Sequence, residues 1–145
     1  MKIVIDARLY GLENAGLGRY VMNLIRNLQN FDKDNEYVLI LRKKYYDSLK
    51  LPQKWSKMLF DHRHYSFNEQ LLLPKLLKSM NPDLVHFPHF NVPVFYSGPF
   101  VVTIHDLILL HFPTIRSTTL NPLFYWIKFL AYRFVINLAL RRAGL

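Results

Sequence analysis

The segments Ile3-Val4-Ile5-Asp6 and Ala15-Gly16-Leu17-Gly18-Arg19-Tyr20 decide the fold of this chain. The first is a short apolar run typical of a buried strand, and the second opens a helix with one apolar face. That face is formed by residues at three- and four-residue spacing, Val21, Leu24, Ile25 and Leu28. A strand, a glycine loop and a helix in this order direct unpaired backbone N–H groups at an anion. We therefore predict a phosphate-bearing ligand near Gly16 and Gly18.

The glycine pattern has a simpler alternative, which is an ordinary tight turn. It is not the dinucleotide fingerprint, which needs three glycines, and it is not a P-loop, because no Gly-Lys-Ser/Thr follows. Arg19 favours the ligand hypothesis, since a guanidinium at a helix start suits phosphate or carboxylate. The alternative for Arg19 is a solvated surface side chain.

Composition indicates one globular domain over residues 1–145, with 51% apolar residues and no cysteine. The absence of cysteine excludes disulfides and thiolate metal sites. The N-terminal apolar run stops at Asp6 and is too short for a signal peptide, so we expect a cytoplasmic protein. The net charge of +9 is concentrated in residues 41–80 and suits phosphorylated ligands or an anionic membrane surface. No nucleic-acid-binding motif is recognisable, so no nucleic acid partner is predicted.

Further apolar runs predict strands over 37–41, 58–60, 84–87 and 100–104. A helix is predicted over 68–80, which Pro74 kinks or in which Pro74 starts a new helical turn. Alternating strands and helices predict an α/β fold, a Rossmann-like parallel sheet with helices on both faces. Ligands of such sheets bind beyond the carboxyl ends of the strands. The glycine loop, His86 to His89, and His105 with Asp106 all lie at such ends.

His105 directly follows the most β-branched run and is a candidate acid, base or sugar ligand, with Asp106 orienting a neighbour or capping the next segment. The alternative for His105 is a hydrogen bond to backbone. His86 and His89 invite a metal hypothesis with His105, but no further ligand is apparent and Pro88 separates the pair. We predict no metal and interpret both histidines as pocket wall. His62 and His64, in a polar segment, are expected to be solvated.

Residues 119–142 predict a long apolar helix at the end of the chain, with Pro122 near its start. Lys128 and Arg133 lie within it and argue against a membrane span. Two alternatives stay open for this helix. It is buried between the sheet and a partner domain, or it lies on a membrane surface with help from the basic residues.

Taken in order, these motifs resemble the N-terminal domain of family 4 glycosyltransferases, which have the GT-B fold. The resemblance covers essentially the whole chain, although many members have a further glycine where this chain has Ala15. The segments that carry it are Met1 to Arg8, Gly16 to Tyr20, Glu69-Gln70-Leu71-Leu72-Leu73-Pro74, Asp83-Leu84-Val85-His86 and Val102-Thr103-Ile104-His105-Asp106-Leu107.

The resemblance implies transfer of a sugar from a nucleotide-sugar donor to a glycan or lipid-linked acceptor, with retention of the anomeric configuration and without a cofactor or required metal. It implies that the N-terminal domain mainly holds the acceptor, in a pocket for which His86, His89 and Tyr20 are the candidates. It further assigns Gly16, Gly18 and Arg19 to the donor diphosphate. His105, with Asp106, is then the catalytic candidate that reaches the donor sugar.

The family's C-terminal domain, which carries most nucleotide contacts, is missing from these 145 residues. We expect an excised fragment, a truncated gene or a half enzyme that works with a second chain. The expected partners are therefore the two substrates and a donor-binding domain in cis or in trans, with an anionic membrane surface left open. A non-catalytic binding module with the same fold is the alternative function.

Overall fold

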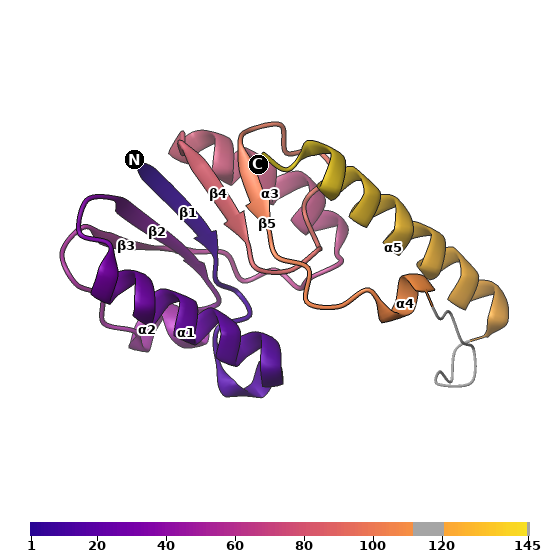
Figure 1. Ribbon diagram of the computed structural model, residues 1–145, viewed down its shortest axis with the longest axis horizontal. Coiled ribbons are helices and arrows are strands. Elements are labelled where there is room, and N and C mark those ends of the chain that lie inside the picture. The colour runs from indigo at the N-terminus through magenta and orange to yellow at the C-terminus, as the bar shows by residue number, and fades with distance from the viewer. Residues whose placement is uncertain (112–120, 145) are drawn as a thin grey trace.

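The computed structural model describes residues 1–111 and 121–144. It is a five-stranded, all-parallel sheet with helices on both faces, as the sequence predicts (Figure 1). The strand order is β3-β2-β1-β4-β5. The bounds of the strands are β1 (Lys2–Asp6), β2 (Glu36–Leu41), β3 (Trp55–Leu59), β4 (Leu84–Phe87) and β5 (Phe100–Val102).

Strand β1 is central and is paired on both sides. Ile3 lies opposite Tyr37 of β2 and Leu84 of β4. Because successive side chains of a strand point to opposite faces, β1 contributes to two cores. Val4 packs into one of them and Ile5 into the other, and both side chains are fully buried. This explains why β1 reads as a continuous apolar run.

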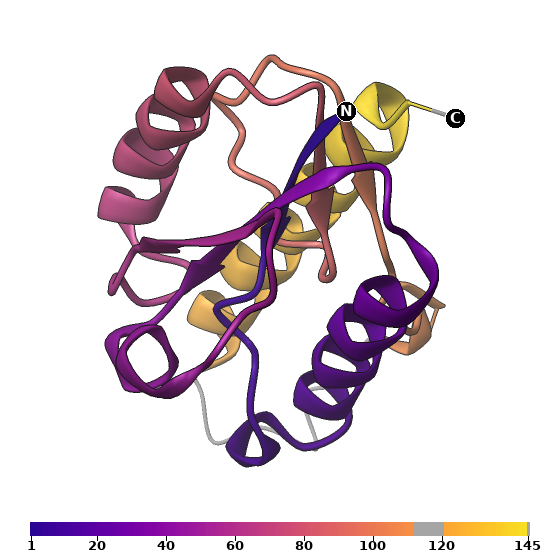
Figure 2. The same cartoon turned by 90° about the vertical axis from the view of Figure 1, so that its left-hand side faces the viewer.

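Helix α1 (Ala15–Phe31) covers one face of the sheet, and the helices on the opposite face are seen in Figure 2. Val21 and Ile25 of α1 are buried against Ile5 and Leu39, so the predicted apolar face of this helix is confirmed. A short 3-10 helix, η1 (Leu12–Asn14), connects β1 to α1, and α2 (Lys43–Ser48) follows β2.

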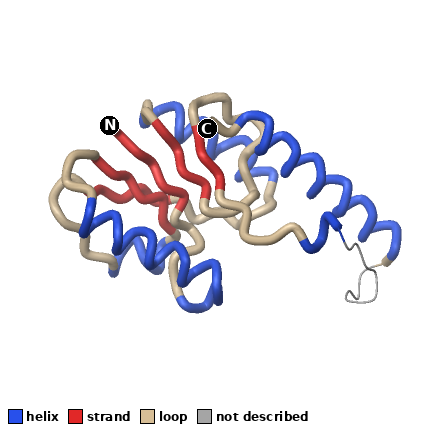
Figure 3. Tube along the Cα trace, in the orientation of Figure 1, coloured by secondary structure: helices blue, strands red, loops and turns tan. Residues whose placement is uncertain are grey.

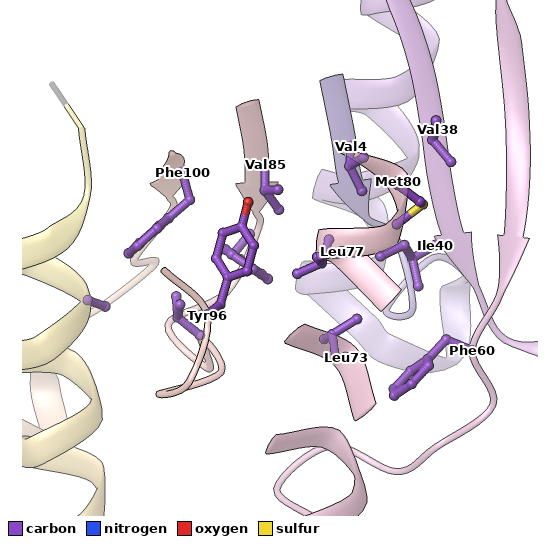
Figure 4. Packing of buried hydrophobic residues seen from close by; sticks show 13 residues of the cluster. Val4, Val38, Ile40, Phe60, Leu73, Leu77, Met80, Val85, Tyr96 and Phe100 are labelled. Atoms are coloured by element: carbon purple, nitrogen blue, oxygen red, sulfur yellow. The ribbon is translucent and has the colours of Figure 1, made fainter. Parts of the chain in front are cut away.

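The second face is covered by α3 (Phe67–Met80) and α5 (Pro122–Arg142). Leu73 and Leu77 of α3 enter a core with Val4 and Ile40, drawn in Figure 4. Ala139 of α5 belongs to the same core. Helix α3 continues through Pro74 as one helix.

Two strand boundaries differ from the sequence prediction by more than one residue. β5 ends at Val102, although the backbone N–H of the next residue, Thr103, still donates to the carbonyl of Phe87 in β4 at 2.9 Å. β3 begins earlier, at Trp55, whose ring stacks on Tyr37 with centroids 4.2 Å apart. Residues 119 and 120 of the predicted terminal helix lie outside the described residues.

The loops that follow β4 and β5 run along the carboxyl edge of the sheet, where Figure 3 shows them in tan. After β5 the chain forms the short helix α4 (Ile108–His111). Beyond α5 the chain returns to the sheet, where the backbone N–H of Gly144 donates to the carbonyl of Phe100 in β5 at 2.9 Å. The fold thus brings three predicted motifs to one edge.

Candidate functional site

The two glycines of the first motif have different surroundings within the first turn of α1. A Cβ atom at Gly18 would overlap the carbonyl oxygen of Gly11, whereas one at Gly16 would meet nothing within 4 Å. Gly18 is therefore required for packing against the preceding loop. Gly16 leaves an open backbone surface, the property that the phosphate hypothesis needs.

The start of α1 carries no side-chain cap. The N-cap residue Asn14 makes no capping hydrogen bond, and its amide donates instead to the carbonyl of Leu9 at 3.0 Å. The first turn also contains no acidic residue. Backbone N–H groups at such a helix start attract anions. Arg19, predicted to act with them, is exposed one turn into the helix.

Tyr20 and His86 form a hydrogen-bonded chain through Thr103. The Tyr20 hydroxyl lies 3.0 Å from the Thr103 hydroxyl, which lies 2.9 Å from Nε2 of His86. Burial lowers the pKa of His86, which keeps this imidazole neutral at physiological pH. The chain ties α1 to β4 and to the end of β5 beneath the carboxyl edge.

His105 is held by two contacts directly after β5. Its Nε2 lies 2.9 Å from the carbonyl oxygen of Pro88, and because a carbonyl only accepts, this nitrogen carries the proton. The Tyr20 ring meets the imidazole edge-on, with centroids 4.7 Å apart. The hydrogen bond from His105 to backbone, which was the alternative to a catalytic role, is thus present. It fixes the tautomer and leaves Nδ1 as the second polar atom of the ring.

Asp106 caps the next helix, as one of the two predictions for it states. Its Oδ1 accepts a hydrogen bond from the backbone N–H of Ile108 at 3.1 Å. The side chain is exposed and borders the same cavity as His105.

A cavity of about 370 Å³ lies at this edge. Of the predicted site residues, His105, Asp106 and His89 contribute to its wall, whereas Gly16, Gly18, Arg19, Tyr20 and His86 do not. Leu17, between the two glycines, does contribute. Burial, followed by the proximity of His105, lowers the pKa of His89. The structure therefore brings the two strand-end motifs together and places His86 and Tyr20 behind them.

Besides Leu17, sequence reasoning missed two aromatic wall residues, Phe90 and Tyr132. Their rings meet edge-on with centroids 4.8 Å apart. Tyr132 lies on the inner face of α5 with the buried residues Phe129 and Ile136. The three- and four-residue spacing of these residues would have placed Tyr132 on that face.

A buried charge network, also missed, reaches the loop that contains His89. Arg8 donates to both oxygens of Asp6, at 2.7 and 2.6 Å, and to Glu69 at 2.6 Å. Asn91 donates to both oxygens of Glu69 at 2.9 Å. Burial alone would raise the pKa of Asp6, but the charge and hydrogen bonds of Arg8 lower it overall. The network joins β1 to α3 and to the loop that contains His89.

The expectation that His64 is solvated is wrong. Its side chain is half-buried beside this network. Burial, and then the positive charge of Arg8, lower the pKa of His64 to about 4. The polar neighbours in sequence suggested exposure, but Arg8 and Glu69 bring the segment against the sheet edge.

The described residues, 1–111 and 121–144, contain no group of three or more His, Cys, Asp or Glu side chains arranged to hold a metal ion. The expectation of a metal-independent site stays a prediction. What the edge offers is an imidazole held by Pro88 and Tyr20, an aromatic wall and an uncapped helix start. These groups suit a sugar ring and a charged leaving group.

Comparison with protein-family models matches residues 14–143 to Glycosyltransferase Family 4. Searches among curated proteins and among solved structures returned no match. The family match covers most of the chain, and the five-stranded parallel sheet agrees with it. The chain therefore belongs to glycosyltransferase family 4, with the Rossmann-like N-terminal half of the GT-B fold.

Proposed function

We propose that this domain is the acceptor side of a retaining glycosyltransferase, which transfers a sugar from a nucleotide-sugar donor to a glycan or lipid-linked acceptor. It needs no resident metal or cofactor. A donor-binding domain, in cis or in trans, closes over the carboxyl edge of the sheet. The proposal extends the family membership to a donor class, an acceptor class and a stereochemical outcome.

One observation carries the proposal: His105, fixed by Pro88 and Tyr20, stands in a cavity wall that the first turn of α1 also reaches through Leu17. The nucleotide diphosphate gains negative charge as it leaves, and the uncapped start of α1 with Arg19 stabilises that charge. Nδ1 of His105 bonds a hydroxyl of the donor sugar. Asp106 positions the segment that follows, while His89 contacts the acceptor.

Under this proposal residues 1–145 by themselves transfer no sugar, because the donor-binding domain supplies the other half of the diphosphate site. UDP-glucose and GDP-mannose serve as donor probes, and release of UDP or GDP is measured. The chain alone gives no release above the uncatalysed background. The chain mixed with the donor-binding domain of a family 4 enzyme and with glycan and lipid-linked acceptors releases nucleotide with one of the probes, as the sugar passes from the diphosphate to an acceptor hydroxyl.

His105→Ala in that mixture tests the role of the histidine. Loss of a group that stabilises the transition state lowers the rate by about 100-fold or more. His111→Ala, an exposed histidine of α4 outside the cavity wall, is the matched control and leaves the rate unchanged. Association with the donor-binding domain is measured for both variants. Lost transfer with retained association supports catalysis, whereas unchanged transfer supports a non-catalytic scaffold.

A second function, attachment to an anionic membrane surface, is favoured by α5. Its buried face consists of Tyr125, Phe129, Ile136 and Ala139, yet the opposite face exposes Leu123, Ile127, Leu130 and Phe134. The helix is long and apolar enough to cross a membrane, with a mean hydropathy of 1.4, and it carries four cationic residues and no acidic one. An apolar stripe flanked by cations suits the interface of an anionic bilayer. The protein is then cytoplasmic and peripheral at the inner face of the membrane.

Sedimentation with vesicles tests this attachment. We expect binding to vesicles containing phosphatidylglycerol, weaker binding to pure phosphatidylcholine, and weakening by salt. Leu130→Gln reduces binding, whereas Leu12→Gln, at an equally exposed leucine of η1, does not. Binding that changes neither with salt nor with Leu130→Gln would contradict the attachment to an anionic membrane surface. It would have no bearing on the transferase assay.

A further inference from the structure

A second cavity, of about 320 Å³, lies across the carboxyl ends of β1, β2 and β3. Arg8, Arg42 and Asp61 each follow one of these three strands, and all three line the cavity. The carboxyl edge of a parallel sheet is where ligands of this fold class bind. The glycosyl-transfer site proposed above lies beyond β4 and β5, so it does not account for this cavity.

Arg8 brings an incompletely paired guanidinium to this cavity. Its side chain is fully buried, and two of its nitrogens are taken by Asp6 and Glu69. The third nitrogen, Nη1, is buried without a hydrogen-bond partner among the residues that the structure describes. A buried N–H group without an acceptor is costly, and guanidinium groups satisfy such N–H groups best with paired oxygens.

Arg42 repeats the same feature on the neighbouring strand. Its Nε is also buried and has no partner in the described part of the chain. Neither Arg42 nor Lys43 has a carboxylate within 4.0 Å there, whereas Lys44 is paired with Glu13 at 3.1 Å. Two cations are thus left at the cavity without an anion.

The carboxylates limit the charge of a ligand. Asp61 lines the cavity without an ion pair to a described cation, and Asp6 and Glu69 lie behind Arg8. The cavity is therefore not a strongly positive well. A ligand with one negative charge shared by two oxygens matches it better than a multiply charged one.

We propose that this cavity is an oxyanion subsite, which takes a singly charged phosphate or carboxylate group between Arg8 and Arg42. Arg8 Nη1 and Arg42 Nε donate to its oxygens, and Lys43 closes it from the exposed side. The proposal that this group belongs to the sugar acceptor rests on the proposed function, but the subsite itself does not.

The subsite is linked to the transfer site through the buried network. Glu69 accepts from Arg8, which lines the oxyanion cavity, and from Asn91, which follows the wall residues His89 and Phe90 of the transfer cavity. An acceptor with a charged group at one end and a reactive hydroxyl at the other would span the two cavities. The geometry thus favours a phosphorylated or acidic acceptor over a neutral one.

Titration calorimetry on the full chain at low ionic strength tests the subsite with three probes: the methyl phosphodiester of glucose 1-phosphate, which carries one negative charge, glucuronate and glucose. We expect saturable binding of at least one of the two anions and none of glucose at the same concentrations. Preference for the phosphodiester identifies a phosphate group as the natural feature, and preference for glucuronate identifies a carboxylate. The signals of the arginine side-chain N–H groups, followed by NMR, shift with the binding anion.

Variants locate the binding. Arg42→Gln and Lys43→Gln each weaken it, the former by about tenfold. Lys75→Gln with Lys78→Gln, two exposed lysines of α3 outside the cavity, changes nothing. If Arg42→Gln unfolds the chain, Lys43→Gln and the NMR signals of the arginine side chains still show whether the anion binds in this cavity.

The proposal is overturned by equal binding of glucose, by equal loss in the lysine control, or by the absence of any saturable anion binding, which would mean that water alone fills the cavity. His105→Ala leaves anion binding unchanged. A loss of anion binding and a loss of sugar transfer can therefore be observed independently of each other.

Discussion

Ala15 has a backbone conformation that suits glycine, with φ of +49° and ψ of −128°. A residue with a Cβ pays about 1–3 kcal/mol for such a conformation, and glycine adopts it freely. This gives a physical reason for the glycine that many family members carry there. We predict that Ala15→Gly raises the free energy of unfolding by about 1 kcal/mol in urea titrations. Ala131→Gly, in the exposed middle of α5, should lower it by a similar amount.

Gly16 and Gly18 should respond to alanine in opposite directions. Gly18→Ala forces a methyl group into the carbonyl of Gly11, and overpacking of this kind costs about 1–3 kcal/mol. Gly16→Ala meets open space inside a helix and should stabilise the chain by about 0.5–1 kcal/mol. Thermal unfolding of the pair measures both effects. Equal losses in the two variants would contradict the packing role assigned to Gly18.

At the scale of single elements, α3 begins with a reciprocal cap. The Ser66 hydroxyl accepts from the backbone N–H of Glu69 at 3.2 Å, and the Glu69 carboxylate accepts from the N–H of Tyr65 at 2.6 Å. Ser66→Ala should lower the free energy of unfolding by about 1 kcal/mol. Ser79→Ala, whose hydroxyl bonds only the Leu76 carbonyl within the last turn, is the control and should have little effect. Equal responses would argue against the cap.

The elements with a clear apolar pattern could be predicted from sequence, and the short helices η1, α2 and α4 could not. The face of α1 with Val21 and Ile25, and the apolar runs of β2 and β4, depend on local patterns. Helix α2 was not predicted, because its charged sequence contains no buried residue. The helix is held in position by contacts with β3 and by the ion pair of Lys44 with Glu13. Its formation depends on residues far away in the chain.

At the scale of the whole molecule, the candidate site was predictable where it follows strands. His105 and His89 were found because strand ends share one edge of a parallel sheet. Arg8 and Glu69 belong to segments that carry the family resemblance, but their ion pair could not be predicted from sequence. They are 61 positions apart, and only the folded sheet brings them together. Tyr132 comes from the opposite end of the chain. Sequence patterns thus predict which residues lie at the carboxyl edge of the sheet, whereas the remaining site residues come from contacts between distant parts of the chain.

The buried network should also set the acid stability of the whole molecule. The pKa of His64 falls from 6.5 in the unfolded chain to about 4 in the folded one, chiefly because the ring is buried beside Arg8. Between these values the unfolded chain binds the extra proton, so stability falls as the pH is lowered from 6.5 to 4. The loss is on the order of 3 kcal/mol when the whole window is crossed. The lowered pKa of Asp6 adds a further loss below pH 3.8.

His64→Gln removes the first of these losses and keeps the second. We therefore predict that the free energy of unfolding of this variant, from urea titrations at several pH values, declines less steeply between pH 6.5 and 4 than that of the wild-type chain, because only the share of the loss that comes from the lowered pKa values of His86 and His89 remains. His62→Gln, two residues away, should retain the wild-type slope. The expected difference between the slopes of the two chains is at most about 1.4 kcal/mol per pH unit, because the variant lacks one titrating proton. Equal slopes in the two chains would show that His64 is as solvated in the folded chain as in the unfolded one. Arg8 would then face the sheet edge without the histidine beside it.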